Sequence, residues 1–418
     1  MSLPSKSWFV DNLPLWLYIT LFKAGGWLYF ITLPVFGERV FPIWMVGLCI
    51  GAASLFQLLL DVPAGMILDR WGYARLLRFS SISLIMGGVI LSIFGLHSWT
   101  YLSFILFSGI GWLFFGPGVD AYTLRIAPRT HTGRFMSIRR LTSSLGAVIG
   151  ATLFTLLLNK PPQTIGIVVA AILACATIVG SLLKKEPHRS HIHKATQTHS
   201  VTHPHIFARA LHTIKALNPA SSMLIFSGFA AATFYGIVSF VIPLHLKDAV
   251  HAGPLQFALS IFDLTVILCG GFIGRLADSN KKRLFVFLGL CLFALSSTFM
   301  SMNLNSWFLV FGFMASVGDE LLTVSLWSWL NHLNHDHVHD GLIASIIAFF
   351  QDLGWVIGPI IAGFAYTRFG ASQTILFGAG VVCISWAINS IALRNSAGTI
   401  LHTPPSPLPV PYHDRHKE

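Results

Sequence analysis

Charged side chains are scarce in this 418-residue sequence, in which Asp, Glu, Lys and Arg together make up only 10% of the residues. A soluble domain carries about 25% charged residues. Hydrophobic residues make up 54% of the chain, and its mean hydropathy is +0.70. This composition excludes an ordinary soluble globular protein and a disordered one, and it predicts an integral membrane protein.

Several motifs that would indicate enzymes or energy-converting sites are missing. The five cysteines form no C-x-x-C pair, which argues against a zinc or disulfide framework. The sequence has no phosphate-binding G-x-x-x-x-G-K-[ST] loop, no H-E-x-x-H and no G-x-S-x-G. An intramembrane aspartyl protease would need a Tyr-Asp element, and none is present. We therefore expect neither enzymatic activity nor a cofactor.

Long apolar runs dominate the chain instead. About 20 apolar residues in a helix cross a hydrocarbon core of about 30 Å. The sequence contains twelve such runs, at 14–36, 41–67, 78–97, 99–124, 140–158, 164–183, 221–245, 254–276, 284–302, 306–330, 342–366 and 371–393. These runs predict an all-α polytopic membrane protein with twelve transmembrane helices.

Lys and Arg cluster on one side of the predicted membrane. If the N-terminus is cytoplasmic, 22 of the 27 lie on the cytoplasmic side, four lie outside, and Lys23 lies within the first span. The positive-inside rule then places both termini in the cytoplasm. Because membrane topology accounts for the excess of Lys and Arg, we expect these residues to contact membrane lipid and not nucleic acid.

The two halves of the chain repeat each other at an offset of 208 to 209 residues. The corresponding positions are Leu33-Pro34 and Ile242-Pro243, Gly65 and Gly274, Ser98-Trp99 and Ser306-Trp307, and Gly146 and Gly354. A constant offset through separate elements indicates a duplication. We predict a six-helix bundle at 1–183, a His-rich cytoplasmic linker at 184–220, a second bundle at 221–395 and a cytoplasmic tail with Pro and His at 396–418.

The stretch from Asp61 to Arg75 reads Asp-Val-Pro-Ala-Gly-Met-Ile-Leu-Asp-Arg-Trp-Gly-Tyr-Ala-Arg. It resembles the signature between helices 2 and 3 of the major facilitator superfamily of secondary transporters, and a degenerate copy stands at 274–283. The resemblance covers residues 10–395. It implies two pseudo-symmetric six-helix bundles around a central site, a monomer, and a bacterial inner membrane protein.

The same resemblance implies a conformational latch that holds the two halves together on the cytoplasmic side when the transporter opens outward. Glycine permits tight turns and close helix contacts, and an acidic side chain can meet a helix N-terminus or an Arg. The alternative is that the charges are solvated and only set topology. The latch residues are Asp61, Gly65, Asp69, Arg70, Gly72, Arg75, Gly274 and Asp278.

Charges within the spans are candidate coupling sites, since each costs at least about 2.5 kcal/mol at the bilayer centre unless it meets a partner or water. In the family, helices 1, 4, 7 and 10 line the central cavity. Adjacent Asp319 and Glu320 point about 100° apart, so we expect one to face the cavity and the other to pair with a neighbouring helix. A permanent ion pair of one of them with Lys23 is the alternative. The candidates for substrate and proton coupling are Lys23, Trp112, Asp120, Tyr235, Asp263, Asp319 and Glu320.

These features favour proton-coupled transport of a small organic solute, which we expect to be zwitterionic, anionic or amphipathic, because lysine, carboxylates and aromatics suit such a molecule. Drug antiporters of the family often carry an Arg midway along helix 4, whereas the span 99–124 has none. This departure argues against proton-driven drug export.

Histidine clusters leave a second function open. Seven of the 18 histidines lie in the linker, and His335, His337 and His339 follow the tenth predicted span. Imidazole binds transition metals, so the chain could instead transport a divalent metal or a metal chelate. A solvated, weakly basic loop is the simpler interpretation, and the cavity helices carry no His at mid-membrane.

Overall fold

The computed structural model describes residues 10–126, 132–183, 219–248, 257–277, 281–302, 307–333 and 340–399, together with residues 279 and 304. These residues form helices almost throughout, because a backbone within lipid must satisfy its own hydrogen bonds. The helices of the first half are α2 (Leu13–Glu38), α3 (Ile43–Trp71), α4 (Tyr73–Phe94), α5 (Ser98–Ile126), α6 (Thr132–Leu157) and α7 (Pro162–Ser181). Those of the second half are α10 (Pro219–Asp248), α11 (Ser260–Ala277), α12 (Lys282–Met302), α13 (Trp307–Leu333) and α14 (Asp340–Thr399).

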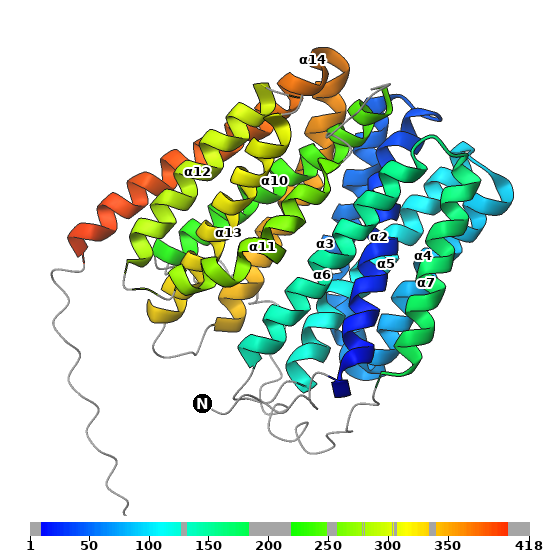
Figure 1. Ribbon diagram of the computed structural model, residues 1–418, viewed down its shortest axis with the longest axis horizontal. Helices are drawn as coiled ribbons and strands as arrows, with labels where there is room; N and C mark the ends of the chain where they lie inside the picture. The colour runs from blue at the N-terminus through cyan, green and yellow to red at the C-terminus, as the bar shows by residue number, and fades with distance from the viewer. Residues whose placement is uncertain are drawn as a thin grey trace, which may run out of the picture.

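The 60-residue α14 is two membrane spans. A continuous helix of that length would be about 90 Å long, roughly three times the hydrocarbon thickness. The helix breaks at Gly370, whose φ of +77° is left-handed, and Figure 1 shows the chain turning back at the top of the molecule. With this break, the described residues contain the twelve predicted spans, and the predicted all-α fold is confirmed.

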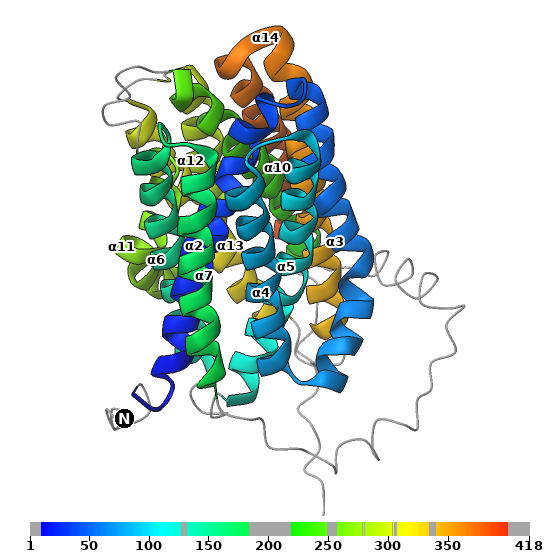
Figure 2. The same cartoon turned by 90° about the vertical axis from the view of Figure 1, so that its right-hand side faces the viewer.

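The helices form two bundles that lie side by side, α2–α7 and α10–α14 (Figures 1 and 2). We call the end where α7 finishes and α10 begins the linker end, and the end that holds Arg39 and Gly370 the far end. Between bundles, α3 packs on α14, α6 on α11, and α2 on α10. Which end faces the cytoplasm remains a prediction from the charge distribution.

Two helices begin at least five residues before their apolar runs. The prediction started the fifth span at residue 140, but α6 begins at Thr132, and α4 begins at Tyr73 rather than 78. Hydropathy locates the part of a helix that faces lipid, and it is blind to a polar extension of the same helix. As a result Arg139 and Arg140, which the sequence placed at the loop boundary, lie well inside α6.

Glycine pairs set the same helix contact in both halves. A Cβ on Gly150 would lie 2.5 Å from the carbonyl oxygen of Ala24 on α2, and one on Gly358 would lie 2.7 Å from that of Thr233 on α10. Small residues let backbones approach this closely in lipid. The repeated sequence therefore produces equivalent packing of α6 on α2 and, in the second half, of the part of α14 before Gly370 on α10.

The far end is closed by contacts between the bundles. Gly47 of α3 meets Gly363 of α14, where a Cβ on Gly47 would lie 2.9 Å from the Gly363 Cα. Lys247 at the end of α10 donates to Glu38 at the end of α2. At the linker end the second bundle has a separate hydrophobic core, formed only by its own residues. Among the described residues, the close glycine contact between the bundles thus lies at the far end, whereas the separate core at the linker end belongs to the second bundle alone.

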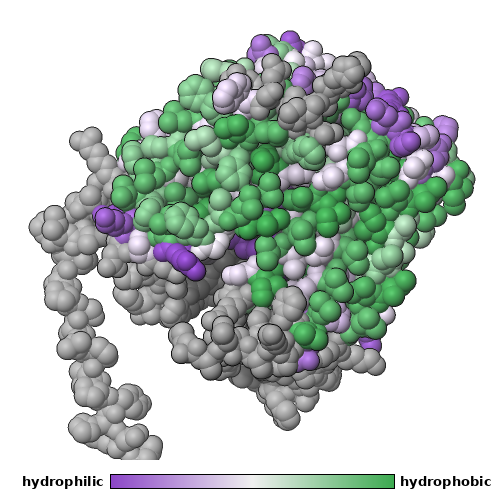
Figure 3. All heavy atoms as spheres, viewed as in Figure 1, coloured by the Kyte–Doolittle hydropathy of each residue, from purple (hydrophilic) through white to green (hydrophobic). Residues whose placement is uncertain are grey.

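The outer surface suits a bilayer. Figure 3 shows hydrophobic side chains across the middle of one face, with hydrophilic ones gathered at the upper right rim. Exposed large apolar residues such as Leu59, Ile178 and Ile391 are more than 60% accessible. In water such a patch would aggregate, and in lipid it is the expected surface.

We predict that Gly47→Leu opens the far end. The added side chain overpacks the contact with Gly363, which costs about 1–3 kcal/mol, so the closed population should fall several-fold. The measurement is bismaleimide cross-linking of Glu38→Cys to Lys247→Cys in a protein that lacks its native cysteines. Gly380→Leu is the control, because no atom lies within 4 Å of a Cβ there. Equal cross-linking in both variants would show that this glycine contact does not hold the far end closed.

Candidate functional site

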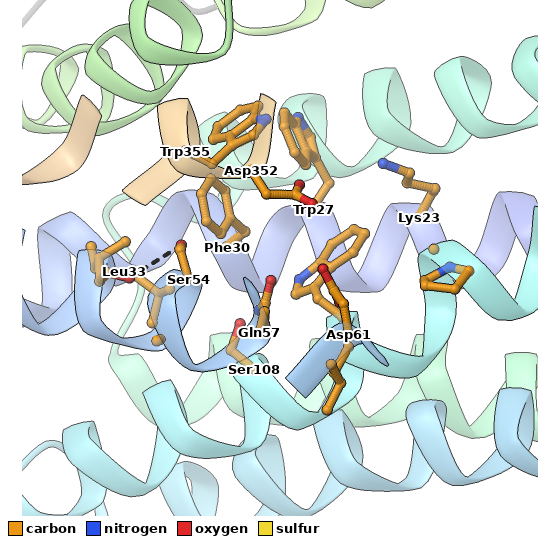
Figure 4. A pocket seen from close by; sticks show the side chains of 16 residues that line it. Lys23, Trp27, Phe30, Leu33, Ser54, Gln57, Asp61, Ser108, Asp352 and Trp355 are labelled. Carbon is orange, nitrogen blue, oxygen red and sulfur yellow. Dashed lines mark hydrogen bonds between the residues drawn. The ribbon is translucent and has the colours of Figure 1, made fainter. Parts of the chain in front are cut away.

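Two cavities lie between the bundles. Cavity 1 has a volume of about 310 Å³ and is lined by α2, α3, α5 and α14, as Figure 4 shows. Cavity 2 has a volume of about 210 Å³ and is lined by α2, α10, α11, α13 and α14. Trp27 and Trp355 line both, so they separate the two spaces. Of these two, cavity 1 reaches the size of ordinary small-molecule sites, which begin at about 300 Å³, and cavity 2 does not.

Lys23 lies at one wall of cavity 1, with its ammonium held by two indole rings. Its Nζ is 4.8 Å from the ring centre of Trp112 and 5.3 Å from that of Trp27. Cation–π contacts of this kind stabilise an ammonium away from water. Within the described residues, Lys23 forms no ion pair, and Asp263 is the carboxylate that attracts it most.

Asp61 and Asp352 face each other across the bundle interface in cavity 1. Figure 4 shows the two side chains pointing toward the same space, Asp61 from α3 and Asp352 from α14. Each carboxyl group has the other as an acidic neighbour, and two like charges held close together disfavour the ionisation of both. The sequence grouped Asp61 with the latch, and it did not count Asp352 among the site residues.

The acidic pair of α13 binds to partners in both bundles. Asp319 accepts a hydrogen bond from the Tyr235 hydroxyl at 3.1 Å, and Glu320 pairs with Arg140 of α6 at 2.8 Å. Glu320 is only 7% accessible. The expectation that one residue pairs with a neighbouring helix holds for Glu320, and both residues line cavity 2. The Arg140–Glu320 pair connects the two bundles.

The alternative ion pair of Lys23 with Asp319 or Glu320 does not form in the described structure. Arg140 takes that place, because α6 continues past its apolar run and carries the guanidinium toward α13.

Two further candidates have partners as well. Asp120 of α5 forms an ion pair with Arg139 of α6 at 2.6 Å, within the first bundle. Asp263 of α11 has Ser144 of α6 as a neighbour, in the region where α6 and α11 pack on each other between the bundles. Adjacent arginines therefore have different tasks, since Arg139 holds its own bundle together and Arg140 reaches across.

Other site residues were missed by the sequence analysis. The resemblance favoured four cavity helices, and the structure adds α3, α11 and α14 to the walls. Gln57, Ser54 and Ser108 supply neutral polar groups, while Phe30 and Trp355 supply aromatic ones. Nothing in a uniformly apolar helix tells which side faces a cavity, so these positions gave no signal.

The latch candidates are only partly described. Gly72 alone connects α3 to α4, with a left-handed φ of +86° that favours glycine. Arg70 and Arg75 are exposed at the linker end, and no atom lies within 4 Å of a Cβ built on Gly274. The side chain of Asp69, the local packing of Gly65, and Asp278, His335, His337 and His339 lie outside the described residues. Among described side chains, no group of three or more His, Cys, Asp and Glu could hold a metal.

Comparisons with known proteins agree with this architecture. Multidrug resistance protein MdtH of Aeromonas salmonicida is 30% identical over 167 residues, which cover 37% of this chain and 40% of that protein. MdtH of Klebsiella pneumoniae is 32% identical over 133 residues, 32% of this chain and 33% of the relative. The match thus spans less than half of the length of these relatives.

Solved structures of low sequence identity share the fold over nearly the whole chain. A bacterial homologue of the lysosomal transporter Spinster, described as inward-facing and unoccupied, has a TM-score of 0.71 at 13% identity, covering 95% of this chain and 99% of that one. A POT family transporter in complex with a thioalcohol-conjugated peptide has a TM-score of 0.70 at 13% identity, covering 95% and 98%. At such identity the likeness shows the fold alone.

The match that decides the family is broader. The family model for the Major Facilitator Superfamily matches residues 15–221 and 224–413, nearly the whole chain. Transporters, not enzymes, make up this family, and the twelve apolar spans make the chain an integral membrane protein. The chain belongs to the Major Facilitator Superfamily.

Proposed function

We propose that the protein is a proton-coupled secondary transporter that moves a small amphipathic organic solute by alternating access. One observation carries this proposal: the cavities lie between two bundles that duplicate each other, and carboxyl groups from both bundles line them. Rocking of the bundles around such a site exposes it to each side in turn. We further propose that it works as a monomer in a bacterial inner membrane.

The closed far end assigns this structure to one side of the cycle. Glycine contacts and the Glu38–Lys247 pair join the bundles there, while the core that the described residues form at the linker end belongs to the second bundle alone. If the linker end is cytoplasmic, as the basic residues predict, the structure faces inward. The latch around Asp69 would then form in the opposite, outward-facing state.

Protons are the proposed energy source. The sequence has no nucleotide-binding loop, so uphill transport needs an ion gradient. Asp319 is well placed as a carrier, since it lines cavity 2 and neighbours the Arg140–Glu320 pair that joins the bundles. Protonation there would change the charge balance at the interface.

An amphipathic organic solute fits the walls better than a metal. Cavity 1 is lined mainly by aromatic and aliphatic side chains with a few polar groups. The relatives named multidrug resistance proteins support an organic solute. Metal transport remains the alternative through His335, His337 and His339, but oxygen ligands beside Lys23 make a poor site for a borderline-soft ion.

A charge exchange tests the pair between the bundles. Arg140→Glu or Glu320→Arg alone should abolish solute flux into proteoliposomes, because each leaves two like charges facing each other. The double exchange should restore part of the flux. Exchange of Arg139 with Asp120, a pair within one bundle, is the comparison. A double Arg140/Glu320 variant as inactive as the singles would contradict a role for this attraction.

Asp319→Asn should abolish substrate-driven proton movement while leaving substrate binding, because the amide keeps a hydrogen-bonding group but cannot ionise. The measurement is internal pH in proteoliposomes after solute addition, with Asp11→Asn as a control at an exposed position. Full coupling in Asp319→Asn would show that this carboxyl group is structural.

Asp69→Asn should slow transport without reducing insertion or thermal stability, because the latch charge is used in one conformation only. Flux per molecule of purified protein is the measurement. Unchanged flux at normal expression would remove Asp69 from the mechanism.

A further inference from the structure

Cavity 1 carries charges of opposite sign at separate places on its wall. Of the residues that line it, Lys23 is the only base, and Asp61 and Asp352 are the only acids. Figure 4 shows Lys23 apart from the two acids, with Trp27 and Gln57 nearer to the acidic side chains. The cavity is therefore dipolar as well as aromatic.

The positive end is available to a ligand. Lys23 rests on the faces of Trp27 and Trp112, and it forms no ion pair within the described part of the chain. The aromatic faces hold the cation without neutralising it. An anionic group that enters cavity 1 would find an ammonium without a competing carboxylate at contact distance.

The negative end carries about one charge. Asp61 and Asp352 point toward the same space, and repulsion between two neighbouring carboxylates favours a pair that holds one proton and one negative charge. Neither residue forms an ion pair with a base in the described structure. Together with Lys23, the pair makes the wall of cavity 1 close to neutral overall.

The surface of cavity 1 is otherwise uncharged. Phe30, Leu33, Leu113 and Trp355 give it an apolar lining, and Ser54, Gln57 and Ser108 add neutral hydrogen-bonding groups. A solute with a flat apolar body matches this lining. A solute of one charge sign would meet a like charge on one wall, whereas a solute with both signs meets an opposite charge at each.

We propose that cavity 1 binds an aromatic zwitterion, with its anionic group at Lys23 and its cationic group at the Asp61–Asp352 pair. This proposal rests on the proposed transport of an organic solute and narrows it to one charge class. It also gives Asp352 and Asp61 a direct part in substrate recognition, in addition to any role near the latch.

Four indole compounds of matched shape test the proposal: L-tryptophan carries both charges, tryptamine only the ammonium, indole-3-propionate only the carboxylate, and indole-3-propionamide neither. Binding to the purified full chain in lipid nanodiscs is measured by equilibrium dialysis at pH 7. We expect L-tryptophan to bind at least about tenfold more tightly than each of the others. Equal or tighter binding of a singly charged or neutral compound would overturn the proposal.

Variants of the cavity residues test which charged group of the solute meets Lys23 and which meets the acidic pair. Lys23→Met should weaken the binding of L-tryptophan and indole-3-propionate, and tryptamine should bind this variant no more weakly than it binds the unchanged protein. Asp352→Asn should still bind L-tryptophan and tryptamine, because Asp61 still supplies one negative charge. The double change of Asp61 and Asp352 to Asn should abolish the binding of both compounds. Lys160→Met and Asp11→Asn, both at exposed positions, are the matched controls. If each cavity variant lost the binding of all four compounds to the same extent, the assignment of the anionic group to Lys23 and of the cationic group to the acidic pair would be contradicted.

Uptake of the four indole compounds into proteoliposomes distinguishes the zwitterion proposal from the proposed organic-solute transport on which it rests. If proteoliposomes take up the indoles in order of hydrophobicity, with no dependence on Lys23 or the acidic pair, organic-solute transport stands and the zwitterion proposal falls. If none of the four binds or crosses, both proposals fail for solutes of this size.

Discussion

An ionisable side chain within a membrane must face a partner or water, and this constraint organises the centre of the protein. Arg140 and Glu320 meet across the bundle interface at 2.8 Å, and Asp120 meets Arg139 within one bundle at 2.6 Å. Lys23 uses aromatic faces instead of a carboxylate. Because Arg140 and Glu320 come from different bundles, moving the bundles means exchanging their interaction for water, substrate or protons.

Rigid packing within each bundle makes such a movement possible as a unit. Gly150 against Ala24 and Gly358 against Thr233 hold equivalent helices in backbone contact in each half. The contact between Gly47 and Gly363 is of the same close kind but joins the two bundles at the far end. Close contacts within bundles and one close crossing between them are what a rocking mechanism requires.

Much of the fold could be predicted from the sequence, because the apolar runs, the loop charges and the repeat each report directly on membrane topology. The ends of helices could not, since a polar extension such as 132–140 in α6 has no hydropathy signal. This one error placed Arg139 and Arg140 at the loop boundary and left Asp120 and Glu320 without their partners.

Site residues were predicted where a charge stands out against an apolar background, as with Lys23, Asp263 and Asp319. Their contacts depend on helix rotation, which uniformly apolar helices do not encode. Asp61 and Asp352 illustrate this limit, because they occupy unrelated positions in the two repeats and meet only through the crossing of α3 and α14.

The central claim is that the two bundles rock around the cavities, closing one end as the other opens. The direct measurement uses double electron–electron resonance, which gives the distance between two spin labels. The labels stand at two exposed pairs, Trp71 with Lys281 at the linker end and Arg39 with Arg368 at the far end. In nanodiscs, a change of pH or a transported solute should shorten the first distance and lengthen the second together. Distances that stay fixed, or that change in the same direction at both ends, would contradict alternating access by this movement.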